Sequence, residues 1–253
     1  MELKENNNNP YPDKIWIMWL QGYDNAPEIV KLCIDSIKKY SGNKEIILID
    51  KDNISNYVNL PDFIEEKYKK GIISHAAYSD IVRSYLLYYY GGTWIDSTLY
   101  CTKNIEFLFD NDFLIYREYS KRLPYYISNW FIHSKNPYNK LIKCILLSLY
   151  NYWKYNNKIV HYFLFYFFHR IAISEDIECK QIWDNTPVFL TYNAKLFLRE
   201  LCGYNGGYNK KMVEYARGLN HFHKLTYKTD YFVLKIDQDK LVSQIKKDIC
   251  EHS

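Results

Sequence analysis

The sequence lacks the features that mark several common classes of protein. Its 253 residues include six cysteines, but no pair has the C-x-x-C spacing of a zinc ribbon or a dithiol redox site. Residues 1–13 are polar and contain no apolar stretch of the secretory type. The longest apolar runs, of about ten residues, are too short to span a bilayer. We therefore expect reduced thiols and a cytoplasmic protein, with peripheral contact, if any, at the inner face of the cell membrane.

Familiar catalytic and nucleotide-binding motifs are absent as well. The sequence contains no G-x-G-x-x-G, no Walker loop, no G-x-S-x-G and no H-E-x-x-H. Lys and Arg number 33 against 29 Asp and Glu, which gives a formal net charge of +4. Because this excess is small and forms no basic stripe, we expect no nucleic-acid partner.

Aromatic residues, in contrast, are abundant. The chain has 27 Tyr, 13 Phe and 6 Trp, which together make 18% of its residues. Such a chain can bury ample apolar area, so a disordered protein is excluded. Two explanations stay open for the tyrosines: the codon usage of an AT-rich genome, and stacking on a planar or sugar ligand. Because no Gly-, Pro- or Ser-rich linker divides the chain, we expect a polar arm at residues 1–13 and one domain at residues 14–253.

The first part of the chain has the pattern of a β-α-β unit. Continuous apolar runs at residues 14–20 and 45–50 predict two buried strands. Between them, Pro27 opens a helix that continues to about Tyr40, with apolar residues at helical spacing. The unit predicts an α/β fold whose sheet is at least partly parallel. Further helices are expected at residues 63–70, 76–90, 141–154 and 158–173, and further strands at residues 93–95, 114–117 and 130–133.

Polar residues follow the predicted strands or lie on the helix that faces them. Residues 19–22 come after the first strand, Asp50 ends the second, and Asp96 follows the third. The long helix before that third strand carries Asp80 and Arg83. In open α/β sheets, ligands bind beyond the carboxyl ends of the strands. We therefore expect these residues to share one crevice.

Asp80 and Arg83 are three residues apart and so lie on one face of their helix. Their neighbours are mainly apolar, and a charge in such surroundings needs a partner. Two interpretations stay open. The two residues form an intrahelical ion pair that holds the helix to the sheet, or they present fixed groups to sugar hydroxyls and phosphate, a task suited to the planar guanidinium of Arg.

Asp96 emerges from a predicted buried strand into the polar residues Ser97 and Thr98. A carboxylate flanked by hydroxyls can hold a divalent cation against a diphosphate. The alternative is an Asx-turn at the end of the strand. The pattern alone leaves both open.

Several blocks of sequence resemble one enzyme family. S-D-I-V-R at residues 79–83 and Y-G-G-T-W-I-D at residues 90–96 resemble the S-D-x-x-R and Y-G-G-x-[WY]-[IL]-D motifs of glycosyltransferase family 32. The most similar branch is that of the capsular polysaccharide synthesis proteins. Each block is weak by itself, but their order and spacing over most of the chain make the resemblance specific. The other matching blocks lie at residues 19–28, 70–74, 162–165 and 223–228.

The resemblance implies a GT-A fold, which is a single α/β domain that binds a nucleotide-sugar and usually a divalent metal. The implied activity is transfer of a hexosyl group from a UDP-sugar to a hydroxyl of a surface or capsular polysaccharide or oligosaccharide precursor, with retention of configuration. The implied metal is Mn²⁺, with Mg²⁺ as the alternative. Residues 14–133 would form the nucleotide-sugar-binding core, and residues 134–253 the acceptor-side helices and a C-terminal closing segment.

The resemblance also implies roles for individual residues. Trp19 would stack on the nucleotide base, since an indole suits the flat face of any base. The implied catalytic residues are Asp80, Arg83 and Asp96, the last of which takes the first position of the family's D-x-D motif. The other implied nucleotide-sugar contacts are Gln21, Gly22, Asp50, Gly92, Ser97, Asn129 and Lys224, in addition to Asp80 and Arg83.

One position departs from the wider family. Thr98 stands where the second Asp of the D-x-D motif is usual, and a neutral hydroxyl is a poorer metal ligand than a carboxylate. The implied metal set is therefore Asp96, Thr98 and a distant group, for which we expect His223, with His221 as its substitute. Lys224 would neutralise the leaving phosphate.

Two other functions remain open at this stage. The loss of the second Asp fits a catalytically inactive protein that binds a nucleotide-sugar. The abundance of Tyr fits a glycan-binding or scaffold protein of a polysaccharide assembly complex. For the transferase itself, the acceptor would be a glycan or a lipid-linked glycan, and aromatic rings between residues 141 and 173 would stack on its sugars or touch a membrane.

Overall fold

The computed structural model describes residue 3 and residues 14–118, 127–204, 206–231 and 234–252, so the predicted arm at residues 1–13 lies outside it except for Leu3. Within these residues, no helix is long and apolar enough to cross a membrane.

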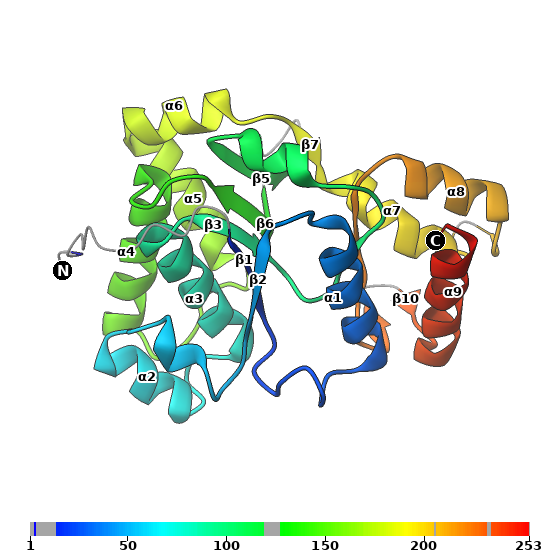
Figure 1. Ribbon diagram of the computed structural model, residues 1–253. Coiled ribbons are helices and arrows are strands. Elements are labelled where there is room, and N and C mark those ends of the chain that lie inside the picture. Colours follow the sequence, from blue (N-terminus) through cyan, green and yellow to red (C-terminus); the bar gives the residue numbers. More distant parts are fainter. Residues whose placement is uncertain (1–2, 4–13, 119–126, 205, 232–233, 253) are drawn as a thin grey trace.

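Figure 1 shows helices on both sides of a central sheet. The strands are β1 Lys14–Met18, β2 Glu45–Ile49, β3 Gly92–Ile95, β4 Leu99–Cys101, β5 Phe113–Arg117, β6 Ile127–Ser134, β7 Phe189–Leu190, β8 Phe222–Lys224, β9 Asp230–Tyr231 and β10 Leu234–Lys235. The helices are α1 Glu28–Tyr40, α2 Asp62–Lys69, α3 His75–Tyr89, α4 Lys140–Tyr155, α5 Leu164–Glu175, α6 Ile177–Asn185, α7 Thr191–Leu201, α8 Lys210–Gly218 and α9 Gln238–Glu251, with short 3₁₀ helices at Ile54–Asn56 and Glu106–Asp110.

Six of the described strands form one sheet in the order β2-β1-β3-β6-β5-β7. β1 runs parallel to both β2 and β3, and β5 runs parallel to β7, whereas β6 is antiparallel to its neighbours β3 and β5. The predicted α/β class and its parallel β-α-β unit are confirmed. This topology brings the carboxyl ends of β1, β2, β3 and β5 to one edge of the sheet, together with the start of β6.

Side chains along β1 alternate between the two faces of the sheet. Trp16 packs into a core with α3, α4 and α5, while Ile15 and Ile17 pack into a second core with α1, α7 and α9. Figure 1 shows these two groups of helices on opposite sides of the sheet. Because both faces of the strand are covered, its sequence is a continuous apolar run without alternation.

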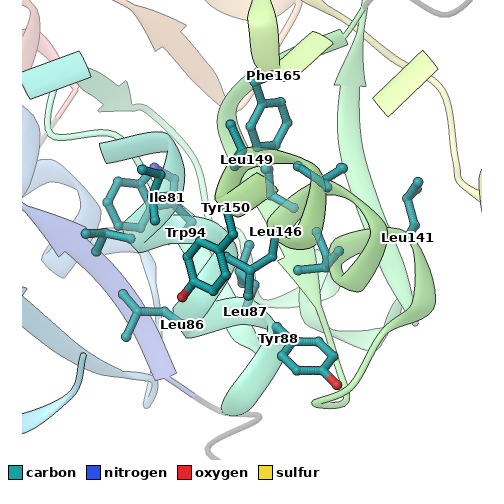
Figure 2. Packing of buried hydrophobic residues seen from close by; sticks show 14 of the residues in the cluster. Ile81, Leu86, Leu87, Tyr88, Trp94, Leu141, Leu146, Leu149, Tyr150 and Phe165 are labelled. Atoms are coloured by element: carbon teal, nitrogen blue, oxygen red, sulfur yellow. The ribbon is translucent and has the colours of Figure 1, made fainter. Parts of the chain in front are cut away.

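The core on the α3 side holds the helix that carries Asp80 and Arg83. Figure 2 shows Leu87 of α3 beside Leu146 and Tyr150 of α4, within one buried cluster. Each such side chain that leaves water on folding contributes about 1.5–3 kcal/mol. This packing offsets the cost of placing charged side chains on the same helix.

The turn from α3 into β3 uses two glycines in the left-handed region, Gly91 with a φ of +71° and Gly92 with a φ of +86°. The Gly91 N–H donates to the carbonyl of Leu87 at 3.1 Å. The Gly91 carbonyl in turn accepts from the indole of Trp16 at 2.9 Å. The predicted glycine stop of this helix is confirmed, and the turn directs β3 along β1.

One predicted helix begins later than expected. The pattern predicts a helix over residues 158–173, whereas α5 runs from Leu164 to Glu175. The Tyr152 hydroxyl donates to the carbonyl of Lys158 and accepts from the N–H of Val160, which ties the preceding segment to α4. The prediction was wrong because this contact overrides the helical pattern of the aromatic residues.

A short antiparallel ladder joins β4 to β8 and places part of the C-terminal quarter beside the end of β3. Leu99 pairs with Lys224, and the N–H of Leu225 donates to the carbonyl of Thr98 at 2.9 Å. Two segments more than a hundred residues apart are thereby held in a fixed register.

Gly91→Ala should destabilise the fold more than Gly71→Ala. The two residues have nearly equal φ, +71° and +70°, so both variants incur the left-handed penalty of about 1–2 kcal/mol. A Cβ at Gly91 would lie 3.0 Å from the carbonyl oxygen of Ser134, whereas one at Gly71 would meet nothing within 4 Å. In urea titrations we expect Gly91→Ala to lose at least about 1 kcal/mol more free energy of unfolding. Equal losses would contradict the close packing of this turn.

Candidate functional site

A cavity of about 730 Å³ opens at the carboxyl ends of β1 and β3. Its walls also come from the first half of α3, the start of β6, the segment before α5 and residues 224–228. A smaller hollow of about 380 Å³ lies at the ends of β1 and β2, and Trp19 and Gln21 line both. Volumes of this size are typical of sites for small molecules.

Arg83 links two carboxylates in the wall of the cavity. Its Nη1 is 3.3 Å from Asp80 Oδ1, and its Nη2 is 3.3 Å from Asp96 Oδ1. The guanidinium also donates to the hydroxyl of Ser79 and to the carbonyl of Asn129, at 2.9 and 2.7 Å. The intrahelical ion pair considered for Asp80 and Arg83 is therefore present, and both of its members line the cavity.

Asp96 is the centre of this network. Its Oδ1 accepts from the Trp94 indole at 2.9 Å as well as from Arg83, and its Oδ2 accepts from the Lys224 ammonium at 2.9 Å. Burial by itself raises the pKa of the Asp96 carboxyl, but Lys224 and Arg83 outweigh it and hold the pKa below its ordinary value. Asp96 is therefore a carboxylate at neutral pH, with both of its oxygens engaged.

At Asp80, in contrast to Asp96, the effect of burial on the pKa outweighs that of the neighbouring positive charge. Burial raises the pKa of its carboxyl to about 6, although Arg83 works to lower it. Its Oδ1 accepts from the Asn129 amide at 2.8 Å, and the Asn129 Oδ1 accepts from the Tyr166 hydroxyl at 3.2 Å. Two carboxyl groups in one cavity thus differ in their affinity for a proton, which is typical of groups with separate tasks.

Lys224 reaches the cavity from β8. Its Nζ donates to Asp96 Oδ2 at 2.9 Å and to the hydroxyl of Thr98 at 2.7 Å. Its side chain is only 14% exposed. The lysine therefore completes a cluster with the D-S-T sequence at residues 96–98, in which the ammonium lies between a carboxylate and a hydroxyl.

The structure does not bring His223 to this cluster. Successive residues of a strand point to opposite faces, and the His223 ring is fully buried against Phe197, with its Nε2 3.2 Å from the hydroxyl of Thr102. Burial lowers the pKa of His223 to about 3. The prediction of His223 as a ligand beside Asp96 was wrong, because the pairing of β8 with β4 turns Lys224 to the cavity in its place.

Two further residues singled out by the sequence also lie elsewhere. Gly92 begins β3 and pairs with Ser134, at the end of the strand opposite Asp96. The prediction that Gly92 contacts the nucleotide-sugar was wrong, because the conformational freedom of this glycine serves the turn after α3. His221, considered as a substitute metal ligand, packs against Phe107 with ring centroids 4.7 Å apart.

The remaining predicted residues divide between the two hollows. Gly22 and Asp50 line the smaller one, where the Asp50 Oδ1 already accepts from the backbone N–H groups of Asp52 and Asn53. The larger cavity is lined by Trp19, Gln21, Asp80, Arg83, Asp96, Ser97, Thr98, Asn129 and Lys224. Their assignment to binding or catalysis stays a prediction at this point.

Trp19 contributes an aromatic ring to the wall of the cavity. Its ring meets Tyr227 edge-on, with centroids 5.2 Å apart and an interplanar angle of 86°. Its indole N–H is buried and has no acceptor among the described residues. A buried donor without an acceptor costs free energy unless a ligand or a water satisfies it.

Sequence reasoning missed one ion pair at the cavity. Glu118 follows β5, and its Oε1 lies 2.7 Å from the Nζ of Lys195 in α7. The rule that singled out Asp50 and Asp96, an acid directly after a strand, would also have found Glu118. Lys195 carries no such signal, because it lies on an amphipathic helix far along the chain. The aromatic lining was only partly anticipated; it includes Trp130, Tyr162, Phe163, Tyr166 and Tyr227.

The residues around Asp96 do not fit a divalent cation in this geometry. Each of the three carboxylates that line the described part of the cavity already faces a Lys or Arg side chain at 3.3 Å or less. Asp96 and Thr98 together offer one engaged carboxylate and one neutral hydroxyl, whereas Mg²⁺ and Mn²⁺ prefer several oxygen ligands. Among the residues that the structure describes, a different set of possible metal ligands, two thiol sulfurs and one carboxylate oxygen, comes together at Cys144, Asp176 and Cys179, none of which lines the cavity.

Comparisons with known proteins agree with the branch that the sequence blocks resemble. The family model described as "Capsular polysaccharide synthesis protein" matches residues 1–245, so the resemblance is confirmed. Among curated proteins, the O-glycosyltransferase braB of Annulohypoxylon truncatum is 28% identical over 101 residues. That match covers 36% of this chain and spans only 24% of the relative's length.

Two solved structures are similar to the chain at low sequence identity. The PaToxG glycosyltransferase is 21% identical with a TM-score of 0.43, and the alignment covers 70% of this chain and 75% of the other. A glycosyltransferase involved in the glycosylation of the major capsid of PBCV-1 is 10% identical with a TM-score of 0.44, over 92% of this chain and 98% of the other. These values describe a distant likeness.

Asp80→Asn should stabilise the protein at neutral pH. A pKa raised from 3.8 to about 6 means that the folded state binds this proton more tightly than the unfolded chain does. Stability is therefore lost as the pH rises through this window, and it is not regained above it. The neutral amide avoids the loss, so we expect the free energy of unfolding at pH 7.5 to rise by roughly 1–3 kcal/mol.

Urea titrations at pH 7.5 and pH 4.5 measure this effect, which should shrink at the lower pH because wild-type Asp80 is then protonated. Asp110→Asn, at an exposed acid in the 3₁₀ helix Glu106–Asp110, is the control and should change the free energy by less than about 0.5 kcal/mol. If Asp80→Asn were less stable than wild type at pH 7.5, the pairing with Arg83 would have to outweigh the burial of the charge.

Proposed function

Because the chain belongs to the capsular polysaccharide synthesis protein family, we propose that it is a glycosyltransferase with a GT-A type of α/β domain. It transfers a hexosyl group from a nucleotide-sugar, with a UDP-sugar as the expected donor, to a hydroxyl of a surface or capsular polysaccharide or oligosaccharide precursor. The configuration of the sugar is retained. The observation that carries the proposal is the network of Asp80, Arg83, Asp96 and Lys224 in a cavity at the carboxyl ends of the strands.

The cations of this network suit the diphosphate of the donor. Arg83 presents a planar guanidinium and Lys224 an ammonium to the same cavity. Among the residues that the structure describes, four Lys or Arg and three Asp or Glu line it, so an anionic ligand meets a small excess of positive charge from them. In a partly buried site, such cations stabilise the charge that develops on a departing diphosphate more strongly than they would in water.

The sugar and the base of the donor fit two different parts of the cavity wall. The sugar lies against Asp80 and Asn129, whose oxygens accept from its hydroxyls. The base lies against Trp19, next to the smaller hollow lined by Gly22 and Asp50. The indole ring supplies a flat apolar surface for stacking.

The reaction exchanges one carbon–oxygen bond for another. The bond between the anomeric carbon and the β-phosphate oxygen breaks, and its electron pair goes to the diphosphate. The acceptor hydroxyl oxygen forms the new bond on the same face of the sugar, and its proton passes to a diphosphate oxygen. Because the carboxylates that line the described part of the cavity are all held in ion pairs, front-face attack is favoured over a carboxylate nucleophile.

The acceptor side corresponds to the aromatic residues just before α5 and in its first turn. Tyr162, Phe163 and Tyr166 line the cavity, and flat rings suit the faces of sugars. Val160, two residues before Tyr162, is 74% exposed. Exposed apolar side chains beside the cavity favour a lipid-linked glycan acceptor, met by peripheral contact of this segment with a membrane.

Thermal shifts and activity assays test the proposed function. A ligand that binds only the folded state raises the melting temperature, and we expect UDP and UDP-sugars to raise it more than CDP or GDP at equal concentration. Asp96→Ala should reduce sugar transfer and donor hydrolysis at least about 100-fold, because it removes the shared partner of Arg83 and Lys224. Asp110→Ala is the control at an exposed acid and should keep the wild-type rate.

All of these assays are run both with and without Mn²⁺, so that the result does not depend on a metal. Wild-type rates in Asp96→Ala would contradict the proposal. Binding of UDP without turnover of any sugar would indicate an inactive nucleotide-sugar-binding protein, which Thr98 in place of the second Asp would favour. Glycan binding that ignores nucleotides and the loss of Asp96 would indicate a scaffold protein.

Val160→Glu should weaken binding to vesicles of phosphatidylglycerol and phosphatidylcholine without changing the thermal shift caused by UDP. A charge in the exposed apolar segment opposes its insertion into lipid. Val188→Glu is the matched control, because Val188 is 64% exposed and does not line the cavity. Co-sedimentation measures the binding. Equal binding of both variants and the wild type would contradict membrane contact through this segment.

A further inference from the structure

We propose that the Lys224 ammonium takes the place of the divalent metal in this site, so that the protein binds and activates its donor without one. The inference rests on the proposed function, because it concerns the diphosphate of the same donor. It replaces the expectation of Mn²⁺ or Mg²⁺ held by Asp96, Thr98 and His223.

The position of the ammonium is the first support. Asp96 Oδ2 and the Thr98 hydroxyl both contact Lys224 Nζ, at 2.9 and 2.7 Å. These are hydrogen-bond lengths for an ammonium. The chain thus places its own cation between the first and third positions of the D-x-D motif, where the motif otherwise holds a metal.

Backbone pairing fixes the lysine in this position. Lys224 pairs with Leu99, and the N–H of Leu225 donates to the carbonyl of Thr98 at 2.9 Å. On the opposite face of β8, the ring of His223 is fully buried against Phe197. Because the strand is anchored on both faces, the ammonium is already in place before a donor arrives, and preorganised charges act most strongly.

The charges also argue against a metal beside the lysine. Arg83 and Lys224 already place two positive charges on the single carboxylate of Asp96. A divalent ion on the same carboxylate would lie within a few ångströms of both, where repulsion between partly buried charges is strong. Moving Lys224 aside would expose only the neutral hydroxyl of Thr98 as a second ligand.

The proposal also gives a reason for Thr98. A hydroxyl accepts a hydrogen bond from the ammonium without adding negative charge, so the positive charge remains available to the diphosphate. An Asp at this position would neutralise Lys224. During transfer the ammonium donates a hydrogen bond to the departing phosphate oxygen and keeps its protons, while the acceptor's proton goes to the diphosphate.

Calorimetric titration of the wild-type protein with UDP is the first test and needs no variant. One buffer contains EDTA and the other contains Mn²⁺. We expect the two dissociation constants to agree within about threefold. Hydrolysis of UDP-glucose, UDP-galactose and UDP-N-acetylglucosamine is measured in the same two buffers, and the rate for the sugar that is turned over should agree equally well.

Lys224→Met keeps an apolar stem of similar length and removes the charge. In EDTA we expect it to weaken UDP binding at least about tenfold and to slow donor hydrolysis at least about 100-fold. Lys103→Met is the matched control. Like Lys224, Lys103 donates a hydrogen bond to a residue far away in the sequence, the carbonyl of Gly218 at 2.7 Å, but it does not line the cavity. Its variant should keep both values of the wild type.

A double variant is designed to replace the lysine by a metal again. Thr98→Asp combined with Lys224→Met supplies the second acid of a D-x-D motif and removes the lysine. We expect its UDP binding and donor hydrolysis to depend on added Mn²⁺, in contrast to the wild type. Full activity of this double variant in EDTA would overturn the inference.

Two further results would overturn it. If the wild type lost UDP binding and donor hydrolysis in EDTA and regained them with Mn²⁺, the inference would fail while the proposed function stood. If Lys224→Met hydrolysed the donor at the wild-type rate in EDTA, the lysine would have no such role. The lack of UDP binding in both buffers would overturn the proposed function itself, and this inference with it.

Discussion

The contacts of Asp96 with Arg83 and Lys224 are the interaction on which the rest of the site depends. Arg83 lies 13 residues from Asp96 in the sequence and Lys224 lies 128 residues from it, so one carboxylate joins α3, the end of β3 and β8. The Trp94 indole donates to the same carboxylate from within β3. Because each cation has this carboxylate as a partner, largely buried charges coexist where an isolated one would not be tolerated. The site therefore exists only when the C-terminal quarter of the chain is in place.

Such a network does little for stability by itself, and the two cores hold it together. Ion pairs in a protein interior seldom gain much more than their desolvation costs. Helix α3 carries both kinds of surface: Leu86 and Leu87 are buried in the core of its second half, while Asp80 and Arg83 line the cavity from its first half. The raised pKa of Asp80 reflects the free-energy cost of burying its charge in this arrangement. A carboxylate kept charged against its own burial is expected of a functional site, where binding requirements override stability.

The elements that frame the site follow from local rules, but the side chain that completes it does not. Apolar runs and Pro27 predict the β-α-β unit, and Gly91 predicts the end of α3. The charged residues of α3 and Asp96 could be found because they interrupt apolar patterns at element ends. The C-terminal block at residues 223–228 was also located by resemblance. Which of its residues enters the cavity depends on the register of β8 against β4, and a shift of one residue in a strand exchanges the two faces. No local pattern encodes that register, so both neighbours, His223 and Lys224, were predicted at the site, whereas only Lys224 lines the cavity.

The donor network and the aromatic wall meet at Asn129. The Tyr166 hydroxyl donates to the Asn129 amide oxygen, and the amide nitrogen donates to Asp80. The proposed front-face transfer needs the acceptor hydroxyl and the leaving diphosphate on the same side of the sugar, so it requires the two walls to be positioned closely relative to each other. The Asn129 amide couples the two walls directly, because it is hydrogen-bonded to both Tyr166 and Asp80. A shift of the aromatic residues therefore changes the surroundings of Asp80. The late start of α5, which the sequence pattern did not predict, leaves Tyr162 and Phe163 ahead of the helix, and both line the same cavity as Tyr166 within it.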